Sequence, residues 1–306
     1  MNEEKMSMTE GTIWKKLVQF AIPLLLGNLF QQLYNAVDSL VVGNFCGNEA
    51  LAAVSSSGSM QHLLIGFFQG VFIGASVIIS RCFGAKDDEG MDEAIHTTVV
   101  FSLAMGVILT ILGVTFTPTI LRWMGTPENV MPNSVTYFRI YCMGLLGMVL
   151  YNTTNGIFNA LGDSRHPLYY LIISSVTNAV QDVLFVGGFG MGVAGASLAT
   201  AISKWVSFVI LIFPYVTRRS LLRLSIRNFC PSRDIVSKVV SMGSSSMFRS
   251  GLAVVSGIML NNLAGDISDA VMAGVGVTNK IMMFPFGIIL GFGNGFQPVA
   301  GFNWGA

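Results

Sequence analysis

An uncharged apolar run near the N-terminus constrains the fold of this chain more than any other feature. From Leu17 to Val37 no residue carries a formal charge, a run of 21 residues. An α-helix of about 20 apolar residues crosses the hydrocarbon core of a bilayer. The run does not end at its first acid, because Asp38 is followed by the apolar residues 40–42. The sequence therefore predicts a membrane-spanning helix that carries an aspartate within the membrane.

The composition places the whole chain in the same class. Hydrophobic residues make up 52% of the 306 residues and charged residues only 11%, whereas soluble domains average about 25% charged residues. The mean hydropathy is +0.65. The net charge is +1, and no basic patch is interleaved with aromatic residues, so no nucleic-acid partner is expected. These values indicate an integral membrane protein.

Charge-poor runs predict about eight membrane-spanning helices and an all-α polytopic fold. The predicted helices cover residues 17–42, a part of 50–80, and residues 94–121, 136–161, 167–187, 192–216, 238–264 and 270–300. Basic residues gather in alternate loops, most densely in the linker 217–237. By the positive-inside rule, the N-terminus and this linker are expected in the cytoplasm.

An internal repeat divides the chain. Two stretches share alanines and glycines at matching positions, with an offset of 220 residues that becomes 221: Ala50, Ala53, Gly70, Gly74 and Gly84 in the first, and Ala270, Ala273, Gly291, Gly295 and Gly305 in the second. Six predicted helices separate them, so both copies have the same orientation, as in parallel-repeat transporters. We therefore expect a six-helix lobe at 1–216, the linker at 217–237, and the first two helices of a second lobe at 238–306. On this symmetry, the 306 residues are a shortened form of a twelve-helix chain.

Polar side chains inside the predicted helices mark a candidate site. Asp182 follows Asn178 by four residues, on one helix face, and Thr200 lies on the next predicted helix. The first helix has a polar face formed by Asn28, Gln31, Asn35 and Asp38. Acids within the membrane are functional by default, and carboxylate and amide oxygens suit a hard cation. The alternatives are acids satisfied by neighbouring amides and asparagines that only join helices.

Three basic residues also fall within predicted spans, namely Lys204, Arg249 and Lys280. Long basic side chains can reach the interface or pair with an acid, so their role in transport stays open.

Signatures of soluble enzymes are absent from the sequence. There is no Walker A loop, no nucleophile elbow and no zinc-protease motif, and the four cysteines form no C-x-x-C pair. We expect no enzymatic activity and no cofactor. Without an ATP site, uphill transport would be driven by an ion gradient or by a partner.

The motifs resemble those of the multidrug and toxic compound extrusion (MATE) transporters, in their prokaryotic DinF-like branch. The matching residues are Pro23, Gln31, Tyr34 and Asp38 in the first helix, the run Asn155–Asp163 leading to Pro167, the pair Asn178 and Asp182, the segment Gly192–Thr200, and Gln297 to Ala306. The resemblance covers nearly the whole chain in order and spacing.

This resemblance implies a fold of two six-helix lobes around a V-shaped cleft, of which the chain has one lobe and the start of the other. It implies export of small organic cations in exchange for H⁺ or Na⁺, by a monomer in the prokaryotic plasma membrane. The cation-coupling and substrate-binding residues carried over by position are Asp38, Asn178, Asp182 and Thr200, with Tyr34, Asn155 and Gln31 nearby. A coupling Na⁺ would lie among the first four.

Two acids in one lobe are expected to titrate as a coupled unit, because like charges disfavour joint ionisation. Two other functions stay open. A lipid-linked precursor flippase of the wider superfamily would need a large basic cavity, which the acids disfavour. A non-transporting membrane scaffold or receptor would use the acids for stability alone.

Overall fold

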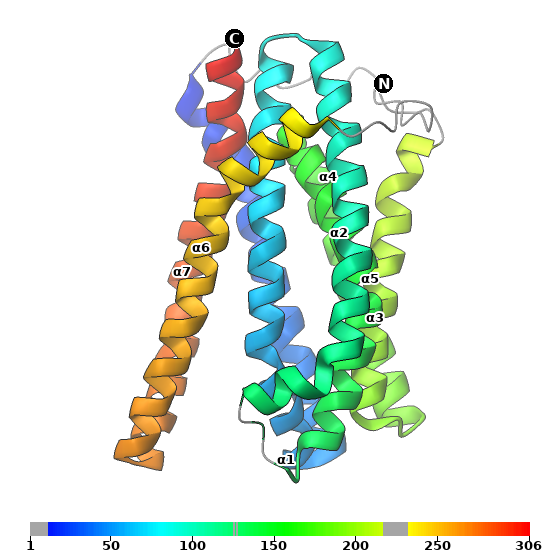
Figure 1. The fold of residues 1–306 in the computed structure, drawn as a ribbon, viewed down its shortest axis with the longest axis vertical. Helices are drawn as coiled ribbons and strands as arrows, with labels where there is room; N and C mark the ends of the chain where they lie inside the picture. Colours follow the sequence, from blue (N-terminus) through cyan, green and yellow to red (C-terminus); the bar gives the residue numbers. More distant parts are fainter. Residues whose placement is uncertain (1–11, 125, 127, 217–231) are drawn as a thin grey trace.

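The computed structural model describes residues 12–124, 126, 128–216 and 232–306, and the described residues outside short turns are helical. In chain order the elements are α1 (Ile13–Gly84), α2 (Asp88–Trp123), α3 (Met131–Ala160), α4 (Arg165–Asp182), the π-helix η1 (Val183–Gly188), α5 (Gly192–Val216), α6 (Arg233–Ile267) and α7 (Asp269–Gly305). Figure 1 shows these helices side by side along the long axis of the molecule, with α6 and α7 as a pair that leans away from the others toward the lower end of the view.

Six segments of the described chain are long and apolar enough to cross a membrane. They are Trp14–Gly47, Leu64–Gly84, Asp88–Trp123, Met131–Ala160, Arg165–Gly188 and Gly192–Ile212. Helices α6 and α7 add two further long helices of 35 and 37 residues. The predicted all-α polytopic fold is therefore confirmed. Outward-facing apolar side chains such as Ile111, at 60% exposure, and Phe116, at 50%, form a surface that suits lipid.

The first two predicted spans are joined by a kink. Helix α1 is continuous except at Gly47, whose φ of 80° and ψ of −177° lie outside the helical range. This φ is one that glycine adopts without steric cost, and the residue marks the turning point between the two spans. We call residues 13–46 the first limb of α1 and residues 48–84 the second limb.

Helix α6 begins at Arg233, five residues before the start predicted from the charge pattern. Asp234 lies in its first turn, where a negative charge stabilises the helix dipole, and it pairs with Lys238 one turn later. The charge of Asp234 fits a helix terminus, whereas the charge pattern had placed Asp234 in the linker. Residues 217–231 of the predicted linker lie outside the described residues.

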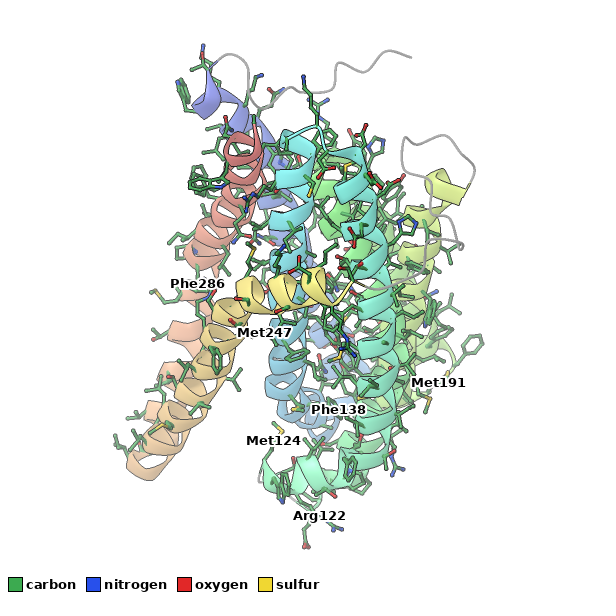
Figure 2. All side chains as sticks on the ribbon, turned by 45° about the horizontal axis from the view of Figure 1, so that its top comes forward. Arg122, Met124, Phe138, Met191, Met247 and Phe286 are labelled. Carbon is green, nitrogen blue, oxygen red and sulfur yellow. The ribbon has the colours of Figure 1, made fainter. Side chains whose placement is uncertain are left out.

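The core of the first lobe forms where α3 packs against α2, α5 and the second limb of α1. Phe68, Phe138 and Leu145 are each about 1% exposed or less and belong to one apolar cluster. Figure 2 shows Phe138 inside the bundle and Phe286 of α7 at the edge of the molecule, where its side chain is 60% exposed.

Glycines set the distance between α1 and the pair α6–α7. A Cβ added at Gly74 would lie 2.2 Å from the carbonyl oxygen of Val239, and one added at Gly243 would lie 2.2 Å from that of Gly70. Met247, labelled in Figure 2, also touches Gly70. Such close backbone contact is typical of helix packing in lipid. We call the glycine contacts of α1 with α6 and α7 the glycine seam.

The glycine seam is reciprocal at the C-terminal ends of the two repeat copies. A Cβ at Gly84 would lie 2.3 Å from the carbonyl oxygen of Phe302, and one at Gly305 would lie 2.1 Å from that of Arg81. The offset of 221 residues carries Gly84 onto Gly305 and Arg81 onto Phe302. Two contacts that exchange in this way are the mark of a two-fold axis. The contacts are those that the predicted parallel repeat requires.

Candidate functional site

The first limb of α1, together with α4 and α5, brings five polar side chains into one group inside the first lobe. Asp38, Asn178, Asp182 and Thr200 are each exposed by 9% or less, and Tyr34 is half-buried. We call these five residues the acid cluster. They come from positions far apart in the sequence, so the fold and not local spacing assembles them.

Hydrogen bonds join Tyr34, Asn178, Asp182 and Thr200, whereas Asp38 interacts with Asp182 through charge alone. In the amide orientation that satisfies both of its ends, Asn178 Nδ2 donates to Asp182 Oδ2 at 2.7 Å and Asn178 Oδ1 accepts from the backbone N–H of Thr200 at 3.2 Å. The hydroxyls of Tyr34 and Thr200 lie 3.0 Å apart and share a hydrogen bond. Asn178 thus fixes the acid of α4 against α5, and Tyr34 fixes α1 against α5.

Two carboxylate oxygens of the acid cluster have no hydrogen-bond partner among the described residues. They are Oδ1 of Asp38 and Oδ1 of Asp182, both shielded from solvent. The two carboxyls are near enough for an electrostatic interaction. A buried, unpaired charge is costly unless a proton or a cation joins it. The unpaired carboxylate oxygens of the cluster can therefore accept a proton or bind a cation.

The predicted cation ligands divide into two kinds in this structure. Asp38 and Asp182 offer free oxygens, whereas the amide and hydroxyl oxygens of Asn178 and Thr200 are already engaged within the cluster. Within the described part of the chain, no group of three or more His, Cys, Asp or Glu side chains could hold a metal. The arrangement suits a proton or a weakly held monovalent cation better than a tightly bound divalent metal.

The remaining two predicted site residues lie apart from the acid cluster in their contacts. Gln31 donates to Asn35 on the same helix at 3.5 Å. Asn155 accepts from Asn159, also on its own helix, at 3.1 Å. The polar face of the first limb is also divided, because Asn28 donates to the carbonyl oxygen of Gly287 in α7 at 3.4 Å. That face therefore serves the seam at one end and the acid cluster at the other.

Local structure around Asp182 positions its carboxylate. Asp182 is the last residue of α4, and the π-helix η1 follows it immediately. A π-helical turn inside a helical segment is rare and frequent at functional sites. Next to it, Val42, Val186 and Ala196 are buried in one apolar group, which packs one turn along α1 from Asp38. This group closes the acid cluster on that side and keeps its surroundings apolar.

Small residues on α5 allow the close approach that the site needs. A Cβ added at Gly144 of α3 would lie 2.5 Å from the Cβ of Ala201. Ser197 donates to the backbone carbonyl of Tyr137 at 2.7 Å and ties α5 to α3. The segment Gly192–Thr200, noted in the sequence for its small residues, therefore packs against α3 and presents Thr200 to the cluster.

Lys204, one turn after Thr200, was not assigned a role from the sequence, and it lies beside the acid cluster. Its Nζ is 5.5 Å from the ring centre of Tyr34 and 5.6 Å from that of Tyr151. Tyr151 was not predicted as a site residue. Two patterns could have indicated both residues, since Lys204 follows Thr200 by four positions and Tyr151 precedes Asn155 by four.

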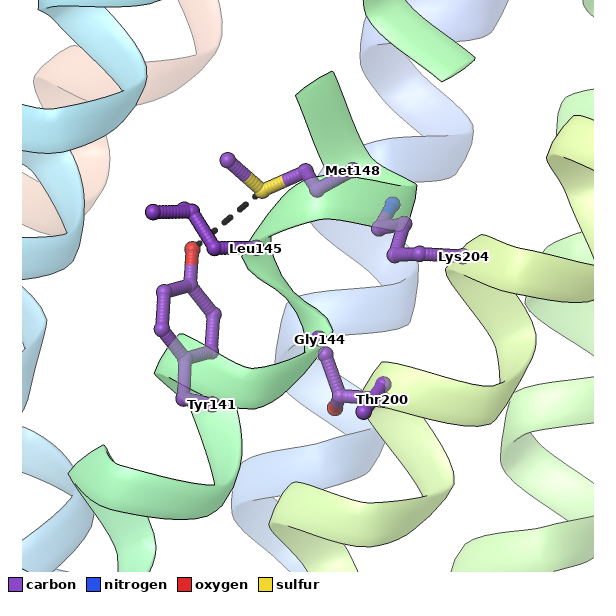
Figure 3. A pocket seen from close by; sticks show the side chains of 7 residues that line it. Tyr141, Gly144, Leu145, Met148, Thr200 and Lys204 are labelled. Carbon is purple, nitrogen blue, oxygen red and sulfur yellow. Dashed lines mark hydrogen bonds between the residues drawn. The ribbon is translucent and has the colours of Figure 1, made fainter. Parts of the chain in front are cut away.

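A small cavity of ≈ 10 Å³ lies beside Lys204 between α3 and α5. It is lined by Tyr141, Gly144, Leu145, Met148, Thr200, Ala201 and Lys204. Figure 3 shows the hydrogen bond of 3.4 Å from the Tyr141 hydroxyl to Met148 Sδ at its wall. Drug-sized ligands need about 300–1,000 Å³, so this cavity is far too small to hold one.

Of the other two basic residues, Arg249 gives no contact to the acid cluster among the described residues. Arg249 is exposed on α6 and donates to Ser246 on the same helix at 3.4 Å. The side chain of Lys280 is outside the described part of the structure.

The sequence of the chain matches a known protein family. The MatE family model matches residues 23–184. The probable multidrug resistance protein YoeA of Bacillus subtilis is 32% identical over 90% of this chain, which covers 61% of that protein. The multidrug export protein MepA of Staphylococcus saprophyticus is 23% identical over 99% of the chain and 68% of its own length. The chain thus spans about 61% of the length of its Bacillus relative.

Solved structures agree with the fold over the whole chain. A transporter of the MOP superfamily from Pyrococcus furiosus, described as having a binding pocket of reverse polarity, superposes with a TM-score of 0.93 at 28% identity. The match covers 100% of this chain and 68% of that protein. An outward-facing multidrug resistance MATE transporter superposes with a TM-score of 0.91 over the same share of both chains.

Proposed function

Because this chain belongs to the MATE family of multidrug transporters, we propose that it carries the ion-coupling lobe of a secondary active efflux transporter. The transported molecules would be small organic cations, exchanged for H⁺ or Na⁺. The chain is a multi-span membrane protein. The proposal includes a prokaryotic plasma membrane with the N-terminus on the cytoplasmic side, a monomeric state, and no cofactor beyond the coupling ion.

The observation that carries this proposal is the pair of unpartnered carboxylate oxygens on Asp38 and Asp182. A structural acid would have its acceptors filled, since buried polar groups in folded proteins are nearly always hydrogen-bonded. Here the surrounding amide and hydroxyl groups are engaged and the two acceptor oxygens remain free. A scaffold protein has no need for this arrangement, whereas an ion-exchange site depends on it.

The exchange follows from the charge of the acid cluster. With the carboxyls ionised, the cluster attracts an organic cation or Na⁺. When a proton or Na⁺ occupies them, the attraction for the organic cation falls and it is released. Because the two acids interact, they titrate as one coupled unit. Asn178 and Tyr34 would carry the change from the acids to α5 and α1 through their hydrogen bonds.

Protonation or cation binding at the acids could alter the shape of the lobe at one point of helix α1. Pro23 lies inside its first limb and has no backbone N–H to donate. Proline is a common cause of sharp helix kinks. Protonation near Asp38 would shift the first limb about this point, and the limb also contacts α7 through Asn28.

Binding and transport of rhodamine 123, a fluorescent organic cation, test the proposal. Fluorescence polarisation would measure its affinity for the purified chain in detergent, and inside-out vesicles would report uptake under an imposed pH or Na⁺ gradient. We expect Asp38→Asn to weaken binding at least tenfold, since it removes a charge of the site. Asp234→Asn is the matched control, because Asp234 is an exposed acid of α6 outside the cluster. Equal affinities of wild type and Asp38→Asn would refute the proposal.

A further inference from the structure

Two exposed tryptophans lie at the same end of the molecule, one at the start of α1 and one at the end of α7. Trp14 is 63% exposed and Trp304 is 79% exposed. The two helix ends meet in an apolar group, in which Leu17 and Phe83 pack against the cluster that contains Phe302. Figure 1 shows both ends close together at the top of the view. Tryptophan favours the membrane–water interface, because its ring is apolar and its N–H is polar, so the pair marks the level of the lipid headgroups.

Two exposed basic side chains at this end have no acidic partner among the described residues. Lys15 follows Trp14, and its Nζ lies 5.9 Å from the centre of that ring. Arg81 lies in the last turn of α1 and borders α7, because a Cβ added at Gly305 would lie 2.1 Å from its carbonyl oxygen. No described carboxylate lies within 4.0 Å of either cation, whereas the exposed Lys238 of α6 forms an ion pair. Both positive charges are therefore available to an anion from outside the chain.

The acids that follow Arg81 in the sequence lie on another side of the bundle. Asp87 caps the start of α2, where its side chain accepts from the backbone N–H of Gly90 at 3.0 Å. Asp88 and Glu89 lie in the first turn of α2. That turn is on the side of the second limb opposite α7 (Figure 1). Among the described residues, the surface at the ends of α1 and α7 therefore carries positive charge.

An apolar strip continues from each tryptophan along its helix. On the first limb of α1, Val18 and Ile22 follow Trp14 at intervals of four residues, and all three side chains are exposed. On α7, Phe296 is exposed eight residues before Trp304. Residues four apart share a helix face, so each strip extends from the headgroup level into the membrane. A cationic surface at the headgroup level with apolar strips beneath it complements a lipid that has a negative headgroup and apolar chains.

We propose that the ends of α1 and α7 form a binding site for an anionic phospholipid. Lys15 and Arg81 bind its phosphate, since lysine and arginine both donate charge-assisted hydrogen bonds to phosphate oxygens. Trp14 and Trp304 flank the headgroup, and the acyl chains lie along the two apolar strips. Anionic lipid attracts basic residues beside a membrane-spanning helix. The acid cluster takes no part, so this inference goes beyond the proposed function.

Native mass spectrometry of the purified 306-residue chain in detergent tests this site. Dioleoylphosphatidylglycerol and dioleoylphosphatidylcholine have the same acyl chains, and only the first has a net negative charge. We expect the first bound molecule of the anionic lipid to bind about tenfold more tightly than the zwitterionic lipid, since two basic residues attract it. Millimolar inorganic phosphate should not displace it, because free phosphate has no acyl chains to place on the apolar strips.

Paired substitutions locate the site. Lys15→Gln combined with Arg81→Gln should remove the preference for the anionic lipid, and Lys15→Arg combined with Arg81→Lys should retain most of it. The matched control is Arg122→Gln combined with Arg139→Gln, which also removes two exposed positive charges. Arg122 lies beside the exposed Trp123 at the opposite end of the molecule from the start of α1 (Figure 2). Thermal unfolding would verify that each variant is folded, and the wild-type affinities test the proposal even if a variant is not.

Three results would overturn the inference. Equal affinities of the wild type for the two lipids would show that no site for an anionic headgroup exists. A preference that survives in the Lys15→Gln and Arg81→Gln double variant would place the anionic lipid elsewhere on the chain. Displacement by inorganic phosphate would show that the site binds free phosphate and not a lipid. Binding of rhodamine 123 is a separate measurement, so the failure of either proposal leaves the other unaffected.

Discussion

The acid cluster and the glycine seam join helices in opposite ways. In the cluster, side chains meet through hydrogen bonds of 2.7 and 3.0 Å, and two carboxylate oxygens have no partner among the described residues. In the seam, backbones meet with no room for a Cβ, as at Gly74 and Gly243. The seam leaves nothing that a ligand could complete, whereas the cluster is incomplete without one.

This difference shows how one membrane protein can hold its helices together in one region and bind and release a ligand in another. In lipid, the hydrophobic effect does not hold helices together, so close packing of small residues must do so. Buried polar groups add little net stability, and unpaired ones reduce it. Changes in the seam should therefore affect folding, and changes in the cluster should affect ligand binding with little loss of stability.

The largest expected effect is on the stability of the seam. Gly243→Leu places a side chain where even a Cβ would lie 2.2 Å from the carbonyl oxygen of Gly70, so α6 must move away from α1. We expect a loss of about 3 kcal/mol or more in the free energy of unfolding, measured by denaturation in detergent. Gly251→Leu on the same helix is the control, because no atom lies within 4 Å of a Cβ there. Similar losses for both variants would show that the seam does not hold α6.

Asp182→Asn should have the opposite effects, retaining the free energy of unfolding and losing affinity for the ligand. The amide keeps an oxygen that can accept from Asn178 and removes a buried charge, so the free energy of unfolding should stay equal or rise. Affinity for rhodamine 123 should fall at least tenfold, because one of the two acids of the cluster is gone. If this variant lost as much stability as Gly243→Leu, the acid would be a structural element and the contrast between the two regions would disappear.

A pH series gives a further test of the cluster alone. Protonation removes the negative charge that attracts the ligand, so the affinity for rhodamine 123 should rise with pH across the titration of the acids, by at most about tenfold per pH unit for each proton released. In the double variant Asp38→Asn with Asp182→Asn, this dependence should vanish. Gly251→Leu should keep the pH dependence of the wild type. A pH dependence that survives in the double variant would assign the titration to other groups.

The smallest expected effect belongs to Tyr34→Phe. It removes the hydroxyl that is bonded to Thr200 at 3.0 Å and keeps the ring that faces Lys204. We expect a change of about 1 kcal/mol in stability or in affinity, measured by unfolding and by polarisation. A loss of tenfold or more in affinity with unchanged stability would mean that the hydroxyl contacts the ligand directly.

The spans of this protein were predictable because a bilayer imposes length and low charge on any helix that crosses it. The charge-poor runs at 94–121 and 192–216 correspond to α2 and α5. The bend between the first two spans was less predictable in form. A loop was expected there, and the chain instead turns at one residue, Gly47, with helix on both sides. Composition shows that charge returns near residue 49 but not how few residues the turn needs.

The candidate site was predictable in part. The spacing of Asn178 and Asp182 put both on one helix face, and the structure joins them by a hydrogen bond. The same reasoning grouped Gln31 with Asp38, but Gln31 bonds within its own helix. A helix face is broad, and its rotation relative to neighbouring helices is set by packing, which the sequence of one helix does not contain. The position of Lys204 beside the cluster could not be predicted for the same reason, since it is defined by the ring of Tyr34 on another helix.

The reciprocal contact at Gly84 and Gly305 has a consequence for the origin of the chain. Near the axis of this contact, Gly301 meets Ser80, the residue to which the repeat offset relates it. A surface that packs against its own copy about a two-fold axis is self-complementary, and this is the property of a homodimer interface. A single six-helix lobe with this surface could pair with an identical lobe before any duplication joined the two in one gene. In such a protein each seam glycine would contribute twice, so one substitution would disrupt both halves of the interface at once.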